Sequence, residues 1–442
     1  MAALAELLDA FEYEVSGSDL KPSRTVQRLR GRGIRVEVGA HRAENVGNAE
    51  HVVVSAAVRQ DNPEVVDARA RGLDVMSRAE LLGRIFDAGR GLAVSGTHGK
   101  TTTSSMLARA LGASGFEPSF LIGGDLNDVG SGAGLGASDI VVAEADEFSD
   151  SFLELRPELA VVTNIDRDHL DYFRNLEAID DAFVAFLDGR REGGTAVVCA
   201  SDEGVVRIRK RIAAPVVTYG YAGADLTLGR SGELAWKGRT IGRLKLSVPG
   251  QHNLLNATGA AAAALALGAE PDSILEGLRT FSGVDRRFSV RGERAGVIVV
   301  DDYAHNPRKI SATVEAARSA YGSRRIVVLF QPHLYSRSLT LSDELGAAFE
   351  GANVIVVTDV YGDREEPIPG VSGRLVSDAA RERAKGATVV YVPRLEEAAA
   401  FVAGISEPDD VVITMGAGDV TSAAPRILSL LETKDDGPEV SS

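Results

Sequence analysis

Gly91-Leu-Ala-Val-Ser-Gly-Thr-His-Gly-Lys-Thr-Thr-Thr103 is an apolar run that breaks at Gly96 and Gly99 and continues into helix-forming residues. This order predicts a strand, a phosphate-binding loop and a helix. The two glycines let the backbone turn tightly with its N–H groups pointing inward. Lys100 then supplies a positive charge for phosphate, and Thr101 supplies a hydroxyl for Mg²⁺.

The spacing of this loop departs from the general phosphate-loop pattern, which has a glycine five residues before Gly99. Val94 stands at that position, so only the G-x-x-G-K-T part of the pattern remains. As a bare pattern it also fits a glycine-rich turn from strand to helix with an exposed lysine. Features elsewhere in the chain have to decide between these two interpretations.

Composition excludes several classes of partner. The 442 residues carry a formal net charge of −15, which argues against nucleic acid and against anionic membrane surfaces. A single cysteine, Cys199, allows no internal disulfide and fits a reducing compartment, and a buried thiol is its expected role. No apolar run reaches the length of a membrane span, and the first residues carry acids where a signal peptide is basic. We therefore expect a cytoplasmic protein with no membrane insertion.

The chain length predicts about three domains. We place them at residues 1–88, 89–287 and 288–432, followed by a disordered tail at 433–442. Apolar runs alternate with helical segments in the second and third domains, which is typical of α/β folds with a parallel sheet covered on both faces. Between residues 216 and 246, short alternating runs with several glycines predict a small antiparallel insertion.

The first domain opens on a helix over residues 2–11 and a strand that ends at Gly17-Ser18-Asp19. Nucleotide-binding α/β units usually begin one element earlier, with a strand and a glycine-rich turn in front of the first helix. Neither is present here. We therefore expect that the sequence as given lacks the first strand and the glycine loop of this domain.

Acidic residues follow two predicted strands of the central domain. Glu144-Ala-Asp-Glu147 ends one strand, and Asn164-Ile-Asp-Arg-Asp-His-Leu-Asp171 follows the next. Both groups should emerge at the same sheet edge as the phosphate loop, where carboxylates suit Mg²⁺ completed by substrate phosphates. For Asp166, Asp168 and Asp171 the alternative is turn capping. For Glu144 and His169 we favour a role at the metal.

Amides and arginines stand at the later junctions. Asn253 and Asn256 lie three residues apart in the first turn of an alanine-rich helix, where amides can read an adenine edge. Helix capping is the open alternative for Asn253. Arg286 and Arg287 precede the third domain, and such a pair is either a solvated surface pair or a phosphate clamp.

Taken together, these motifs resemble those of the Mur ligases, in their order along the chain from residue 2 to about 432. The motifs that carry the resemblance are Gly96-Thr-His-Gly-Lys-Thr-Thr102, Glu144-Ala-Asp-Glu147, Thr163-Asn164, Asp168-His169, His252-Asn253, Asn256, Arg286-Arg-Phe288, Asp301-Asp-Tyr-Ala-His305 and Phe330-Gln-Pro-His-Leu-Tyr-Ser-Arg337. The last two are similar to those of members that add L-alanine to UDP-N-acetylmuramic acid.

The resemblance implies an N-terminal Rossmann-like UDP-sugar domain, here incomplete, a central P-loop ATPase domain and a C-terminal Rossmann-like α/β domain. It further implies ATP and Mg²⁺ as cofactors, an acyl-phosphate intermediate and a role in peptidoglycan precursor synthesis. Its ATP-binding residues are Gly96, Thr97, His98, Gly99, Lys100, Thr101, Thr102, His252, Asn253, Asn256, Arg287 and Asp302. Its metal residues are Thr101, Glu144 and His169, and its catalytic residues are Lys100, Arg287 and His169.

On the substrate side, Tyr303, His305, His333 and Arg337 match the amino-acid and product side of the cleft, and Asp19 and Ser55 are candidates for the UDP-sugar site. Two departures bear on amino-acid selectivity. Asn306 stands where these members often have a second histidine, and Leu334 where many have arginine.

Three alternatives stay open. The first is a related ligase, either one that attaches a recycled murein peptide or a folate-type ligase that adds glutamate. The second is a P-loop GTPase, although no N-K-x-D guanine motif occurs. The third is a degenerate, non-catalytic nucleotide-binding homologue. For the assembly state we expect a monomer or a weak homo-oligomer.

Overall fold

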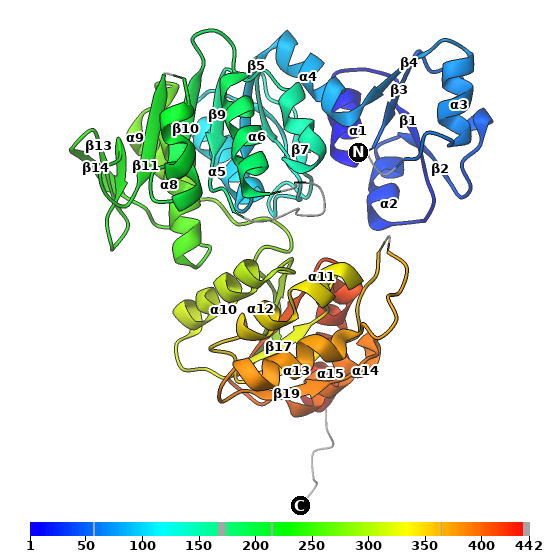
Figure 1. Ribbon diagram of the computed structural model, residues 1–442, viewed down its shortest axis with the longest axis vertical. Coiled ribbons are helices and arrows are strands. Elements are labelled where there is room, and N and C mark those ends of the chain that lie inside the picture. The colour runs from blue at the N-terminus through cyan, green and yellow to red at the C-terminus, as the bar shows by residue number, and fades with distance from the viewer. Residues whose placement is uncertain (56–57, 167–172, 174, 214, 364, 436–442) are drawn as a thin grey trace, which may run out of the picture. The chain divides into compact units, whose positions relative to one another are not determined.

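The computed structural model describes residues 1–55, 58–166, 173, 175–213, 215–363 and 365–435. The chain divides into two compact units, one with residues 1–246 and 254–282 and one with residues 247–253 and 283–442. Both units are α/β (Figure 1). Among the described residues, no helix combines the length and the apolar character needed to cross a membrane.

The first part of unit 1 contains short strands that form two separate parallel pairs, β1 with β2 and β3 with β4. Its elements are α1 (Ala2–Ala10), β1 (Ser16–Asp19), α2 (Arg24–Gly31), β2 (Arg35–Val38), η1 (Ala43–Val46), β3 (His51–Val54), α3 (Pro63–Ala70), β4 (Asp74–Ser77) and α4 (Arg78–Ala88). Helix α4 begins with a capping box, in which the Ser77 hydroxyl accepts from the Glu80 N–H while the Glu80 carboxylate accepts from the Ser77 N–H.

The rest of unit 1 is built on one ten-stranded sheet of order β14-β13-β12-β11-β10-β9-β5-β8-β6-β7. Its strands are β5 (Arg90–Ser95), β6 (Ser119–Leu121), β7 (Ala133–Gly134), β8 (Ile140–Glu144), β9 (Leu159–Val162), β10 (Thr195–Cys199), β11 (Val216–Gly220), β12 (Leu226–Leu228), β13 (Glu233–Trp236) and β14 (Arg239–Arg243). Its helices are α5 (Lys100–Ala113), η2 (Phe148–Glu154), α6 (Leu176–Asp188), α7 (Glu203–Ile208), η3 (Arg209–Arg211), α8 (Gln251–Ala266) and α9 (Pro271–Arg279).

The centre of this sheet is parallel, as the sequence predicts. Strands β8, β5, β9 and β10 run side by side in parallel and are almost wholly buried, which explains their unbroken apolar sequences. The predicted antiparallel insertion is narrower than expected, because β11 continues the parallel sheet and antiparallel pairing within residues 216–246 is confined to β12, β13 and β14. The parallel strands bring the ends of β5, β8 and β9 to one edge of the sheet.

Unit 2 is doubly wound around a six-stranded sheet of order β15-β16-β20-β17-β18-β19. Its strands are β15 (Ser289–Arg294), β16 (Val297–Asp302), β17 (Ile326–Phe330), β18 (Val354–Val357), β19 (Thr388–Tyr391) and β20 (Val411–Met415). Its helices are α10 (Pro307–Tyr321), α11 (Tyr335–Thr340), α12 (Ser342–Ala347), α13 (Gly373–Arg383), α14 (Leu395–Ile405), η4 (Asp419–Ser422) and α15 (Ala423–Asp435). All neighbours are parallel except β15, which pairs antiparallel with β16.

Two apolar clusters, one on each face, hold the helices of unit 2 to its sheet. One cluster includes Ile310 of α10 and Val376 of α13, and the other includes Val402 of α14 and Ile427 of α15. The return of the chain from β19 to insert β20 between β16 and β17 places the ends of these three strands together. Open α/β sheets bind their ligands at such strand ends.

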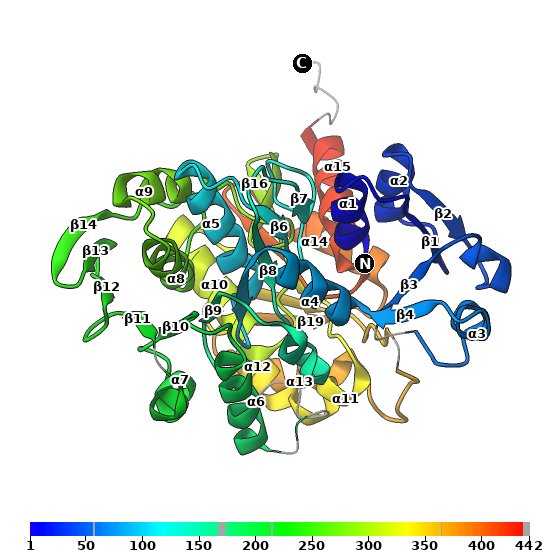
Figure 2. The same cartoon turned by 90° about the horizontal axis from the view of Figure 1, so that it is seen from above.

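Helix α1 belongs to two cores at once. Its Leu4 and Leu7 are buried in the same apolar cluster as the central sheet, whereas Ala2 and Ala5 pack on the small cluster around α2 and β2. Figures 1 and 2 both show α1 beside β7. The first part of the chain is therefore fastened to the central sheet by its own first helix.

Candidate active site

The predicted phosphate loop connects β5 to α5 and can contain only glycine at two positions. Gly96 and Gly99 have positive φ angles of 130° and 81°. A Cβ atom would lie 2.1 Å from Thr163 Oγ1 at Gly96 and 2.5 Å from Asn256 Oδ1 at Gly99. The backbone can follow this path only without side chains, and α5 begins directly after it, with its first N–H groups facing the loop.

Lys100 is bound inside the site, in contrast to the exposed lysine of the alternative interpretation. Its Nζ donates to the Gly96 carbonyl at 2.8 Å and to Glu147 Oε2 at 2.6 Å, while Asp146 lies 3.7 Å away. Burial alone lowers the pKa of Lys100, but the carboxylates of Glu147, Asp146 and Glu144 together raise it above its ordinary value. Burial raises the pKa of Glu147, and the Lys100 ammonium opposes that effect. At 2.6 Å we take the contact as an ion pair.

Thr101 and Glu144 meet at the edge of the sheet, as predicted. The Thr101 hydroxyl donates to Glu144 Oε2 at 2.9 Å, and the Gly123 N–H donates to the same oxygen at 2.9 Å. His169, the third predicted metal residue, lies outside the described residues, as do Asp168 and Asp171. Within the described part of the chain, no group of three or more His, Cys, Asp or Glu residues could hold a metal ion. One carboxylate and one hydroxyl still fit Mg²⁺, which takes few protein ligands and keeps water and phosphate oxygens.

The end of β9 fastens the phosphate loop through residues that the predicted set does not include. The Asn164 amide donates to the His98 carbonyl at 2.8 Å and accepts from the His98 N–H at 2.8 Å. The Thr163 hydroxyl donates to the same carbonyl at 2.6 Å. Asp166 contacts the phosphate loop as well as its own turn. Its N–H donates to Thr97 Oγ1, and its carboxylate lies 3.5 Å from His98 Nε2. The signal for Asn164 was its position directly after a buried strand.

The predicted adenine residues lie in the first turn of α8. Asn256 is buried and lies against Gly99 of the phosphate loop. The Asn253 amide donates to the Pro249 carbonyl at 2.6 Å, a local bond to the loop that precedes α8. Burial lowers the pKa of His252, so this imidazole is neutral at pH 7.

In unit 2, the predicted substrate residues gather at the ends of β16 and β17. The Arg286 and Arg287 guanidinium groups lie 4.9 and 5.1 Å from the centre of the Tyr303 ring. The Asp302 carboxylate accepts from the N–H groups of Phe288 and Ala304, both at 2.7 Å. Burial raises the pKa of Asp302, and the charge of Arg287 opposes that effect.

A histidine pair continues this cluster. His305 Nδ1 donates to the Tyr303 carbonyl at 2.7 Å, and its ring centre lies 5.9 Å from that of His333. Arg337 NH1 lies 3.3 Å from His333 Nδ1. Tyr361 stacks on His333 with ring centres 6.0 Å apart, a neighbour that no local sequence signal indicated. Burial lowers the pKa of His305 well below its ordinary value, with the charges of Lys309 and Arg337 adding to the effect.

The two departures from the family pattern have structural roles of their own. The Asn306 side chain accepts from the Lys309 N–H at 3.0 Å and caps α10, which continues with Pro307 in its first turn. Leu334 has a φ angle of 70°, an uncommon value for leucine, at the start of α11. Its N–H donates to the Tyr361 carbonyl, which holds the segment between His333 and Arg337 in place.

The candidates for the UDP-sugar site lie at strand ends in the first part of unit 1. Asp19 ends β1 and accepts from the Lys21 N–H at 3.1 Å, and Ser55 follows β3. Beside Asp19, the Ser18 hydroxyl donates to Glu64 at 2.7 Å, and His41 lies 3.1 Å from the same carboxylate. Sequence reasoning did not single out this polar cluster.

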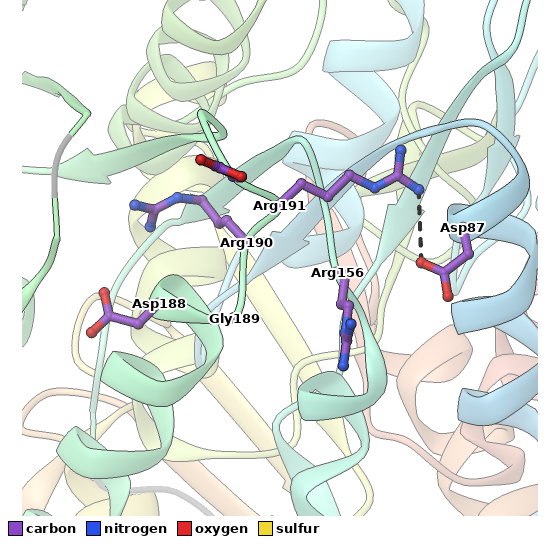
Figure 3. A pocket seen from close by; sticks show the side chains of 7 residues that line it. Asp87, Arg156, Asp188, Gly189, Arg190 and Arg191 are labelled. Atoms are coloured by element: carbon purple, nitrogen blue, oxygen red, sulfur yellow. Dashed lines mark ion pairs between the residues drawn. The ribbon is translucent and has the colours of Figure 1, made fainter.

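A separate cavity of about 700 Å³ lies away from these residues (Figure 3). It is lined by Asp87, Arg156, Asp188, Gly189, Arg190, Arg191 and Glu192. These residues precede β5, β9 and β10, so the cavity lies at the opposite edge of the sheet from the phosphate loop. Three arginines and three acids line the cavity, and an ion pair joins Arg191 to Asp87 at 3.7 Å. Because the charges of the lining balance, we do not interpret the cavity as a phosphate-binding site.

A glycine-rich phosphate loop at the edge of a parallel sheet, followed in the same chain by a doubly wound α/β unit, defines a P-loop α/β protein. Three family models match the chain: the Mur ligase family catalytic domain at residues 1–90, the Mur ligase middle domain at 94–264 and the Mur ligase glutamate ligase domain at 286–418. The chain belongs to the Mur ligase family.

Among curated relatives, the UDP-N-acetylmuramate–L-alanine ligase of Solidesulfovibrio magneticus is 46% identical over 428 residues, covering 95% of this chain and 93% of the relative. The ligase of the same name from Rubrobacter xylanophilus is 46% identical over 436 residues, covering 98% and 97%. Among solved structures, the UDP-N-acetylmuramate-alanine ligase of Thermotoga maritima has a TM-score of 0.82 at 29% identity, covering 98% of this chain and 97% of that one. A murein peptide ligase from Psychrobacter arcticus shares the fold, with a TM-score of 0.72 at 23% identity and coverage of 98% and 96%.

Proposed function

We propose that this chain is an ATP-dependent ligase that joins L-alanine to the lactyl carboxylate of UDP-N-acetylmuramic acid in peptidoglycan precursor synthesis. The observation that carries the proposal is the 46% identity to ligases of that name over nearly their whole length. The phosphate loop supports it, because Lys100 and Thr101 lie where a nucleotide phosphate would be held. The proposal includes the domain boundaries, the cytoplasmic location and the monomeric or weakly oligomeric state given above.

The reaction needs an activated carboxylate, because joining a carboxylate to an amine in water is uphill. The lactyl carboxylate attacks the γ-phosphate of ATP, giving an acyl phosphate and ADP. Lys100 and Arg287 offset charge on the phosphoryl oxygens as the group moves. Mg²⁺, when held by Thr101, Glu144 and His169, supplies further positive charge to the same oxygens.

The amine then has to attack as a free base. His305 donates from Nδ1 to the Tyr303 carbonyl, so its Nε2 carries the lone pair of a neutral imidazole. Its low pKa keeps it neutral at pH 7. In our proposal L-alanine reacts in its free-amine form, Nε2 accepts a hydrogen bond from that amine, and Arg337 binds the carboxylate of the amino acid. The tetrahedral adduct expels phosphate, which leaves with the proton that the attacking nitrogen loses, and the amide remains.

The test is phosphate release from ATP in the presence of UDP-N-acetylmuramic acid, measured across amino acids and short peptides. We expect L-alanine to be preferred over D-alanine and glutamate, with weak use of L-serine and glycine. An apolar pocket discriminates by only about 1–3 kcal/mol per methylene, so some use of glycine is expected. A strong preference for a tripeptide would instead identify a recycling ligase. Phosphate release that needs no amino acid or peptide would contradict both ligase functions.

A further inference from the structure

Lys100 forms a buried ion pair with Glu147. Its Nζ lies 2.6 Å from Glu147 Oε2, and the two side chains are only 13% and 3% exposed. The lysine of a phosphate loop has to bind the β- and γ-phosphates. Two of the three N–H donors of Nζ already bind Glu147 and the Gly96 carbonyl, so a nucleotide phosphate and Glu147 compete for the charge of Lys100.

The burial of Glu147 keeps its carboxylate beside Lys100. Glu147 directly precedes the η2 helix and is buried, so its carboxylate cannot turn into water by a simple side-chain rotation. Three carboxylates, those of Glu147, Asp146 and Glu144, act on the single Lys100 ammonium. With one positive and three negative groups, the loop is unfavourable for a bare anion despite its inward N–H groups.

The balance of charge at the loop differs for a nucleotide that carries a divalent cation. The cation brings positive charge to the Glu144 side of the loop, where the carboxylate already lies beside the Thr101 hydroxyl. The phosphates would then draw Lys100 away from Glu147 while the cation offsets the charge of Glu144. A phosphate group without its cation has no such compensation.

We propose that Glu147 is a specificity-determining residue that holds Lys100 until a cation-loaded nucleotide displaces it, so that the loop rejects inorganic phosphate and metal-free nucleotide. This inference rests on the proposed ATP site. It adds a role for a carboxylate that the ligase mechanism above does not use.

The experiment measures ADP binding to the full chain by titration calorimetry, once with Mg²⁺ and once with a chelator. The variants are Glu147→Gln, which removes the charge and keeps the shape, and Asp146→Asn as the matched control. Asp146 lies 3.7 Å from Lys100 and its side chain is 54% exposed, so its charge is screened by water. Inorganic phosphate serves as a second probe in both conditions.

For the parent we expect ADP binding with Mg²⁺ and weak or unmeasurable binding without it. Glu147→Gln should bind metal-free ADP at least about tenfold more tightly than the parent, because a buried competing charge is gone. Asp146→Asn should change that affinity by less than about threefold. Tight metal-free binding by the parent, no gain in Glu147→Gln, or an equal gain in Asp146→Asn would each overturn the proposal.

Glu147→Asp keeps the negative charge but moves it away from Lys100 by one methylene. This variant tests the competition between Glu147 and nucleotide if Glu147→Gln does not fold. Its affinity for metal-free ADP should lie above that of the parent, and an unchanged affinity would overturn the proposal. If the parent binds no ADP even with Mg²⁺, the proposed function and this inference both fail. If the parent ligates L-alanine and the Glu147 variants gain nothing, only the inference fails.

Discussion

At the scale of single residues, the charge of Lys100 has two partners, Glu147 in the fold and phosphate in the proposed reaction. The ion pair with Glu147 is nearly excluded from water. Removing one partner of such a pair leaves the other as an uncompensated buried charge. A variant at Lys100 therefore tests stability and catalysis at once, and the two effects have to be separated.

Lys100→Ala should lower ligation turnover by about a hundredfold or more, because a contact to the transferring phosphoryl group is lost. It should also lower the free energy of unfolding by up to about 3–5 kcal/mol through the stranded Glu147. The double variant Lys100→Ala with Glu147→Gln should recover most of the stability and none of the turnover. Urea unfolding and phosphate release measure the two quantities. Turnover above about a tenth of the parent would refute the role of Lys100.

His305 gives a prediction for pH. Burial holds the pKa of its imidazole well below the ordinary 6.5 in the folded chain, so the unfolded chain takes up the proton first as pH falls. The contribution of His305 to the free energy of unfolding is fully present above about pH 6.5 and is lost as pH falls from there through the folded pKa. His305→Gln has no such proton uptake.

We expect the unfolding midpoint of the parent to fall more than that of His305→Gln between about pH 7.5 and about pH 5.5. The unfolding midpoint of His305→Gln should still fall somewhat over this range, because burial also lowers the pKa of His252. Thermal unfolding of both proteins across this range measures it. Parallel curves would show that His305 titrates normally in the folded chain.

At the scale of elements, helices α1 and α2 are tied to the loop between β6 and β7. Glu6 is buried and accepts from Arg28 Nε at 2.7 Å and from the Ser131 hydroxyl. Arg28 NH1 also donates to Asp125 at 2.5 Å. The same loop contains Gly123, whose N–H donates to Glu144. The helices of the first part thus support the loop that orients a predicted metal ligand.

Arg28→Ala should cost roughly 1–3 kcal/mol of stability, because it leaves the buried Glu6 carboxylate with the Ser131 hydroxyl as its remaining described partner. Arg28 is 28% exposed, which keeps the cost below that of a fully buried pair. Arg32→Ala is the matched control, because Arg32 forms only a longer surface pair with Asp9 at 3.7 Å. Urea unfolding compares them, and equal losses would contradict a special role for Arg28.

At the scale of the whole molecule, the chain divides after residue 282 rather than after its first part. Unit 2 has a complete six-stranded sheet with apolar clusters on both faces. The first 88 residues have only two pairs of short strands, and Leu4 and Leu7 are buried against the central sheet. Two-stranded sheets are marginal without such support.

We therefore expect a fragment of residues 283–442 to fold alone and to unfold in one cooperative thermal transition. A fragment of residues 1–88 should show weak structure and no cooperative transition. Circular dichroism across a temperature ramp distinguishes the two. Cooperative unfolding of the 1–88 fragment would show that α1 does not need the central sheet.

The sequence by itself determined the phosphate loop and the parallel strands of both α/β regions, because each is set by residues close together in the chain. Glycines and buried apolar runs act through local backbone geometry. Only the tertiary structure decided that Glu147 holds Lys100, that Arg28 contacts a loop 97 residues away and that Tyr361 stacks on His333. Such contacts depend on which strand ends and helix faces the fold brings together, and no local periodicity records that choice. Acidic and basic side chains are also common on surfaces, so their burial as pairs becomes visible only when the neighbouring elements are in place.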